Sequence, residues 1–235
     1  MISTNATGRT IQVARPGDKL LPSLGILLVT GGLVLLGWFA YLWFKLPPAP
    51  YQYQLIAEGD SKQFSQMDLD GWPELKLGQY KVQADGVDKP IAEFIVARQN
   101  EGPPVLIYWK NSTNEILYNF DRKPSELSAL AAAISKHAPK EALILSWWDT
   151  SRQIKLLTGH DTLFTNHLNE PLMIPVTWLE QSKAIQAYEN QFWGSKVNPQ
   201  EREQFERFSQ ALAAPAEEGV KQLRELIGSN REAYV

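Results

Sequence analysis

The sequence contains no cysteine among its 235 residues. Structural disulfides, iron–sulfur clusters, thiol nucleophiles and covalently attached c-type haem are therefore excluded, because each of them needs cysteine side chains. Histidine is also scarce, with His137, His160 and His167 as the only three. The composition thus predicts no bound cofactor. It leaves the compartment open, since a domain without cysteine is stable in the cytosol and in the periplasm alike.

Sequence signatures of common enzyme classes are missing as well. There is no G-x-x-x-x-G-K-[ST] loop, no G-x-G-x-x-G fingerprint, and no G-x-S-x-G elbow around Ser146 or Ser151. Carboxylates are plentiful, but no spacing pairs two of them as acid and base. These absences favour a protein that is not an enzyme, without excluding catalysis.

Basic residues do not cluster in the larger part of the chain. Residues 1–50 carry four basic residues and one acidic residue, a net charge of +3, so the overall charge of −3 leaves −6 for residues 51–235. Nucleic-acid binding needs grouped lysine and arginine side chains that contact phosphates. An acidic globular part therefore excludes nucleic acid as the expected partner.

Leu20–Phe44 form a long stretch without any charged residue. A helix of this length, at about 1.5 Å per residue, is enough to cross a bilayer core of about 30 Å. Trp38, Tyr41 and Trp43 gather at one end, as the aromatic residues of a membrane interface do. A cleavable signal peptide is the competing interpretation, but its apolar region would be shorter and small residues would mark the cleavage site, whereas Ala40 lies between bulky neighbours. We therefore expect an uncleaved transmembrane helix.

The flanking residues predict how this helix is oriented. Arg9, Arg15 and Lys19 precede it, so the positive-inside rule places residues 1–19, as a loosely ordered tail, in the cytoplasm. The larger part of the chain then faces the periplasm, on the outer side of the inner (cytoplasmic) membrane. Residues 45–50 are rich in proline and would act as a stiff spacer between helix and domain.

Residues 51–235 predict one extracytoplasmic domain of the α+β or α/β class. Residues 51–120 are mainly β, with alternating strands and turn residues expected at 51–57, 78–84, 90–98, 105–110 and 115–120. The last four of these pair into two hairpins. Residues 121–235 are mainly α, and their periodicity and caps predict helices over 124–138, 150–158, 177–194, 199–213 and 215–228 around a central strand at 142–147.

Residues 142–164, ALILSWWDTSRQIKLLTGHDTLF, connect that strand to a helix. The chain passes through Trp147, Trp148 and Asp149 at the junction, where ligands usually lie in α/β sheets. A purely structural interpretation stands beside this one. One tryptophan would pack inward while the other covers a second layer, and Asp149 would cap the helix.

The candidate binding residues come from this junction and from the polar loop that follows it. They are Trp147, Trp148, Asp149, Arg152, His160 and Asp161. Tryptophan and arginine supply much of the binding energy at protein interfaces, so a partner-binding surface is one interpretation. His160 and His167 could also be metal ligands, although their spacing fits no metal-site template. The alternative is a loop whose polar groups bond its own backbone.

The W-W-D tripeptide resembles the W-W-D-Y-G motif of oligosaccharyltransferase catalytic subunits, which recognises the hydroxyl residue of an acceptor peptide. Trp147, Trp148 and Asp149 match that motif, whereas Thr150 and Ser151 replace tyrosine and glycine. That family also needs a membrane domain with many spans and acidic catalytic loops, and this sequence predicts one span. The resemblance implies a shared βα element at most, and glycan transfer is excluded.

A broader resemblance covers most of the chain. The apolar stretch LLPSLGILLVTGGLVLLGWFAYLWF is followed by PPVLIYWKN, YNFDRKPSEL and LILSWWDTSRQIKLLTGHDTLF. Together these segments resemble the HaoB family, membrane-anchored proteins encoded beside hydroxylamine oxidoreductase in ammonia- and methane-oxidising bacteria. The resemblance implies an accessory role in hydroxylamine oxidation, with the haem-bearing oxidoreductase as partner. The family supplies no catalytic residues to carry over.

Three hypotheses follow. In the first, a membrane-anchored accessory protein docks a multihaem hydroxylamine oxidoreductase, or another membrane-associated redox protein, at the periplasmic membrane face. The second is a small-molecule or metal-binding enzyme that uses residues 149–167; it predicts a pocket lined by Asp149, Arg152 and His160. The third is a structural subunit of a larger membrane complex, held by the span and by the helices after Pro175.

Overall fold

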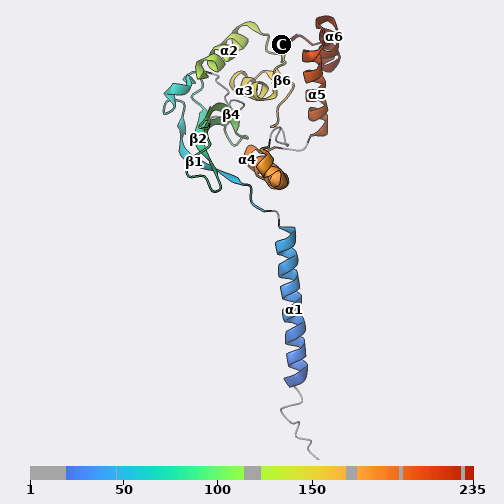
Figure 1. The fold of residues 1–235 in the computed structure, drawn as a ribbon. Helices are drawn as coiled ribbons and strands as arrows, with labels where there is room; N and C mark the ends of the chain where they lie inside the picture. The colour runs from blue at the N-terminus through green and yellow to red at the C-terminus, as the bar shows by residue number, and fades with distance from the viewer. Residues whose placement is uncertain (1–19, 46, 114–122, 168–173, 196–197, 229–230) are drawn as a thin grey trace, which may run out of the picture. The chain divides into compact units, whose positions relative to one another are not determined.

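A computed structural model describes residues 20–45, 47–113, 123–167, 174–195, 198–228 and 231–235 (Figure 1). The chain divides into two compact units, Met1–Leu46 and Pro47–Val235. In the first unit, helix α1 spans Leu20–Phe44. The predicted apolar helix is therefore present, and its segment Pro22–Phe44 is long and apolar enough to cross a membrane.

The second unit begins with a four-stranded antiparallel sheet. Its strands are β1 (Tyr51–Asp60), β2 (Leu75–Ala84), β3 (Ala92–Gln99) and β4 (Val105–Asn111), and they pair in the order β1-β2-β3-β4. Of the two predicted hairpins, the first, 78–84 with 90–98, is confirmed as the β2–β3 pair. It is closed by a turn in which Gly86 adopts a φ of 72° that favours glycine. The strand predicted over 115–120 lies outside the described residues.

Both faces of this sheet are covered by helices, at different ends. Against one face pack the short helix η2 (Ser65–Met67), α2 (Pro124–His137) and Leu157 of α3 (Trp148–Thr158), in a core that includes Leu75 and Leu77. Against the other face packs α4 (Ser182–Trp193), whose Ile185 and Trp193 join Val82, Phe94 and Val96. The alternation of β2 explains this division, because neighbouring side chains on a strand point to opposite faces.

A second, small parallel sheet begins with the strand that follows α2 in the sequence. It consists of β5 (Leu143–Ile144) between β6 (Asp161–Thr162) and β7 (Ala233–Tyr234). The central strand predicted over 142–147 is thus present but shorter. β7 escaped prediction because it has only two residues, and its pairing with β5 depends on a segment about 90 residues away along the sequence.

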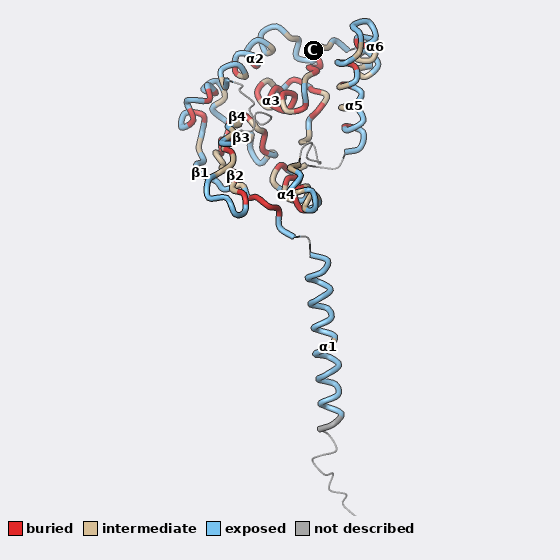
Figure 2. Tube along the Cα trace, in the orientation of Figure 1, coloured by how far each residue is buried: buried red, intermediate tan, exposed pale blue. Residues whose placement is uncertain are grey.

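Helix α3 (Trp148–Thr158) connects β5 to β6 and is buried over most of its length (Figure 2). It begins two residues earlier than predicted. The helix expected over 177–194 starts as a 3-10 turn, η4 (Val176–Gln181), before α4. Two further helices, α5 (Pro199–Ala213) and α6 (Ala216–Ile227), pack on each other. Asn198 caps α5 as predicted, because its side chain accepts a hydrogen bond from the Glu201 backbone N–H.

Candidate functional site

The two tryptophans of the W-W-D junction lie one after the other at the start of α3. Trp147 is the N-cap residue and Trp148 the first helical residue, so their side chains do not alternate across a strand. Their rings stack instead, with centroids 5.7 Å apart and planes 20° from parallel. Phe205 of α5 meets both rings edge-on, at 4.8 Å from Trp147 and 5.1 Å from Trp148.

These stacked rings differ in exposure. Trp148 is 9% exposed and belongs to a core with Leu145, Phe164 and Phe208, whereas Trp147 is 43% exposed. A hydrogen bond spans the segment that carries both rings, because the Ser151 hydroxyl donates to the Ser146 carbonyl at 3.0 Å. Trp147 is therefore a large apolar side chain that is held in place and presented to solvent.

Arg152 belongs to the interior, because its side chain turns from α3 toward the sheet. It is 3% exposed, and its Nη2 donates to the Pro104 carbonyl at 2.6 Å. Its guanidinium carbon lies 5.9 Å from the centre of the Trp193 ring, and Nη1 lies 4.0 Å from Asp149 Oδ1. Burial lowers the pKa of Arg152 to about 10, while the negative charges of Asp149 and Glu201 raise it in part. The side chain is therefore still a cation at neutral pH.

His160 is buried at the end of α3. The Thr158 hydroxyl donates to the Ile154 carbonyl at 2.8 Å, so its oxygen is the acceptor for the His160 ring at 3.0 Å. This arrangement assigns the proton to Nδ1. The other ring nitrogen, Nε2, is buried and has no hydrogen-bond partner among the described residues.

Asp161 and His167 are held by different partners. Asp161 accepts from Arg231 Nη2 at 2.7 Å, and this bond lowers the pKa of the exposed Asp161 carboxyl. The ring of His167 stacks on Trp193 at 4.8 Å with a 1° interplanar angle. Within the described ranges, no three His, Cys, Asp or Glu side chains gather as a metal site would require.

The six predicted binding residues thus divide into two sets. Trp147, Asp149 and Asp161 reach the surface, and Asp149 does so only in part. Trp148, Arg152 and His160 are buried and cannot contact a partner directly. Trp148 stacks on Trp147 and Arg152 lies 4.0 Å from Asp149, whereas the His160 ring bonds Thr158.

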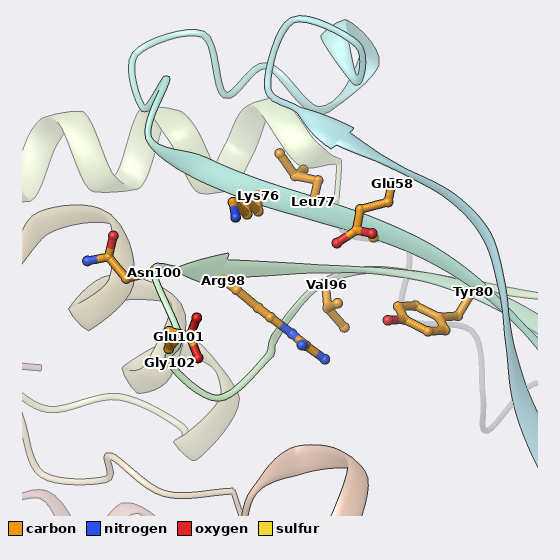
Figure 3. A pocket seen from close by; sticks show the side chains of 10 residues that line it. Glu58, Lys76, Leu77, Tyr80, Val96, Arg98, Asn100, Glu101 and Gly102 are labelled. Carbon is orange, nitrogen blue, oxygen red and sulfur yellow. The ribbon is translucent and has the colours of Figure 1, made fainter.

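A hollow of about 240 Å³ lies elsewhere, over strands β1, β2 and β3 (Figure 3). Residues of β1, β2, β3 and the following turn line it, including Glu58, Lys76, Tyr80, Arg98 and Glu101. It presents two basic and two acidic side chains, so it selects no single ligand charge. None of the predicted site residues lines this hollow.

A second constellation, which the sequence interpretation missed, surrounds Glu189 of α4. Glu189 is 9% exposed, and its carboxylate accepts hydrogen bonds from the Tyr51 hydroxyl, from the Tyr53 hydroxyl at 2.6 Å and from Trp193 Nε1 at 2.6 Å. The hydroxyl of Tyr188 in turn accepts from the Tyr53 backbone N–H at 2.6 Å. Three donors therefore converge on one buried acid, and the two from Tyr51 and Tyr53 join β1 to α4.

One signal in the sequence could have found this constellation. Glu189 lies four residues from both Ile185 and Trp193, on the apolar stripe of an amphipathic helix. A carboxylate at such a position needs polar partners in the core. Tyr51 and Tyr53, two residues apart on one face of β1, supply them.

The phenols beside Glu189 resist ionisation. Burial raises the pKa of Tyr51 and of Tyr53 well above 10, and the negative charge of Glu189 raises both further. Their hydroxyls therefore stay protonated, as the hydrogen bonds to the carboxylate require.

These raised pKa values predict loss of stability at high pH. Above pH 10.0, the ordinary pKa, the tyrosines of the unfolded chain ionise while Tyr51 and Tyr53 of the folded chain do not. The folded state then binds more protons, so the free energy of unfolding falls as pH rises, by about 1.4 kcal/mol per pH unit for each phenol. Arg152 has the opposite effect, because its pKa is lowered by folding and the unfolded chain binds the extra proton. It is a single group against two phenols.

Urea unfolding of the full chain in detergent micelles, repeated between about pH 8 and pH 11, measures this dependence. The Tyr51→Phe/Tyr53→Phe variant removes both phenols and should flatten the slope above pH 10.0. A wild-type curve as flat as that of the double variant would contradict the prediction.

The protein is an α+β domain preceded by a helix that is long and apolar enough to cross a membrane. In this domain, the half-exposed Trp147 is held at the start of a buried helix.

The chain belongs to the HaoB family, since the model of the family described as HaoA-associated protein HaoB matches residues 17–235. The predicted resemblance is confirmed, and the family's association with HaoA supports an accessory role in hydroxylamine oxidation. No curated protein and no solved structure matches the chain at a significant level.

Proposed function

We propose that this protein is a membrane-anchored accessory protein that docks hydroxylamine oxidoreductase at the periplasmic face of the inner membrane. Its membership in a HaoA-associated family supports this partner. The observation that carries the docking surface is the exposure of Trp147, 43%, on a ring fixed by Trp148 and Phe205. A rigid aromatic side chain loses little conformational entropy on binding, which is why such residues dominate interface energetics.

The anchor is helix α1. Its 25 residues extend about 38 Å, more than the hydrocarbon core of about 30 Å. Basic residues precede it and Trp38, Tyr41 and Trp43 gather near its other end, which favours a cytoplasmic N-terminus and a periplasmic second unit. Confining the second unit to the membrane surface raises its local concentration toward a partner on the same surface.

The docking surface has an apolar centre, Trp147, and a charged neighbour, the partly exposed Asp149 in the first turn of α3. Charges at the edge of an interface contribute little affinity and serve mainly to fix orientation. Full-length chain in lipid nanodiscs should therefore bind purified hydroxylamine oxidoreductase at low salt. Absence of binding there would refute the docking proposal.

Charged substitutions in α1 test the anchor separately. Leu33→Asp with Leu35→Asp places two carboxylates near the middle of the helix, each costing about 3 kcal/mol of insertion free energy. We expect the wild type to remain in membranes after an alkaline wash and the double variant to move to the soluble fraction. Leu212→Asp, on the exposed surface of α5, is the control that should stay in membranes. Extraction of the wild type by the wash alone would contradict the anchor.

A further inference from the structure

We propose that Tyr51, Tyr53 and Trp193 form with Glu189 a proton-coupled electron relay, in which an aromatic side chain gives up an electron while its proton passes to the shared carboxylate. This function goes beyond docking and does not depend on it. It rests on one juxtaposition: three oxidisable side chains, from β1 and α4, all donate hydrogen bonds to one buried acid.

The hydrogen bonds supply the path for the proton. Oxidation makes a phenol a strong acid and an indole much more acidic than before, so a buried phenol is oxidised readily only where a base can take its proton. Tyr53 Oη and Trp193 Nε1 each lie 2.6 Å from a Glu189 oxygen, on Oε1 and Oε2 respectively. An ionised carboxylate is an acceptor only, which agrees with the three donors around it. The proton moves along an existing bond, without any rearrangement of heavy atoms.

Ring spacing supplies the path for the electron. The centroids of Tyr51 and Tyr53 are 5.6 Å apart, and those of Tyr53 and Trp193 are 6.4 Å apart. Beyond Tyr51, the ring of Trp178 follows at 5.4 Å; beyond Trp193, that of His167 follows at 4.8 Å. Trp178 and His167 are both partly exposed, so the buried rings connect to the surface at two points.

The step is balanced as follows for Tyr53. The side chain loses one electron to a one-electron oxidant whose potential exceeds that of a phenol, and one proton to Glu189. The products are a neutral tyrosyl radical, a protonated Glu189 and the reduced oxidant. A one-electron reductant reverses the step, and the proton returns along the same hydrogen bond.

Tyr80 offers a comparison within the same aromatic cluster. Its ring stacks on Phe94 at 5.3 Å and meets Phe192 edge-on at 5.2 Å, so its packing resembles that of Tyr53. Among the described residues no carboxylate accepts a hydrogen bond from Tyr80. A relay that needs a proton acceptor should therefore use Tyr53 and not Tyr80.

Flash photolysis tests the proposal on the full chain in detergent micelles. Photogenerated tris(bipyridine)ruthenium(III) is the oxidant, and electron paramagnetic resonance with ring-deuterated tyrosine identifies the radical. All variants carry Tyr234→Phe, because the exposed Tyr234 hydroxyl also donates to a carboxylate, that of Glu232, at 2.7 Å. In this background we expect a long-lived neutral tyrosyl signal when Tyr51 and Tyr53 are present, its loss when both are replaced by Phe, and its persistence in Tyr80→Phe. Glu189→Gln should slow formation of the radical by about 10²-fold, the contribution of a positioned base.

The solvent isotope effect on radical formation in the wild type is a second measurement, and it does not require any variant to fold. A slower reaction in deuterium oxide is expected because the proton moves with the electron. An unchanged signal in the Tyr51→Phe/Tyr53→Phe variant, or wild-type kinetics without an isotope effect, would overturn the relay. Since the oxidant is a small complex, neither result depends on binding of hydroxylamine oxidoreductase.

Discussion

Replacing Glu189 by alanine is expected to lower the free energy of unfolding of the second unit by about 3–5 kcal/mol. The substitution leaves the hydroxyls of Tyr51 and Tyr53 and the indole N–H of Trp193 without their acceptor inside the protein. Each buried unpaired donor costs about 1–3 kcal/mol, and removal of a desolvated charge returns part of the sum. Urea unfolding monitored by circular dichroism measures the change.

Glu203→Ala is the matched control for this prediction. Glu203 lies on α5 and is exposed, so its removal should change the stability by less than about 0.5 kcal/mol. Equal stabilities of the Glu189→Ala and Glu203→Ala proteins would show that the Tyr51–Tyr53–Trp193 constellation does not hold β1 to α4.

Replacing Trp147 by alanine is expected to weaken binding to hydroxylamine oxidoreductase by about 30-fold, equivalent to about 2 kcal/mol. The variant removes the half-exposed ring and leaves the Trp148 and Phe205 rings without their outer contact. The oxidoreductase would be titrated onto variant and wild-type chains in nanodiscs, with affinity read by biolayer interferometry. Circular dichroism confirms that the variant is folded.

Leu130→Ala provides the comparison, because Leu130 on α2 is 41% exposed, close to the 43% of Trp147. Its removal should leave the affinity unchanged within about twofold, which corresponds to about 0.4 kcal/mol. The docking surface would be wrongly placed if Leu130→Ala weakened binding as much as Trp147→Ala, or if Trp147→Ala had no effect.

Local patterns predicted much of the fold. The uncharged run at Leu20–Phe44 forms a helix with those bounds, because nothing in the run needs water and no proline interrupts its interior. Alternation and turn residues placed the β2–β3 hairpin, and Asn198 with Pro199 placed the start of α5. Each of these depends on neighbours within a few residues along the chain.

The site was less predictable because its contacts join distant segments. The carbonyl that receives Arg152 belongs to Pro104, 48 residues earlier, so no local pattern shows that this arginine is buried. The acceptor of Tyr51 is Glu189, 138 residues later. The sequence identified Trp147 as notable, but its stacking on Trp148 follows from the start of α3 at Trp148, two residues earlier than the caps suggested.

Site-specific photo-cross-linking in living cells tests the docking surface most directly. A benzoylphenylalanine placed at position 147 of the full chain, compared with one at position 130, reports which surface meets the partner. Irradiation should join hydroxylamine oxidoreductase to the chain from position 147 and not from position 130. A cross-link from position 130 alone, or equal cross-links from both positions, would contradict docking through Trp147.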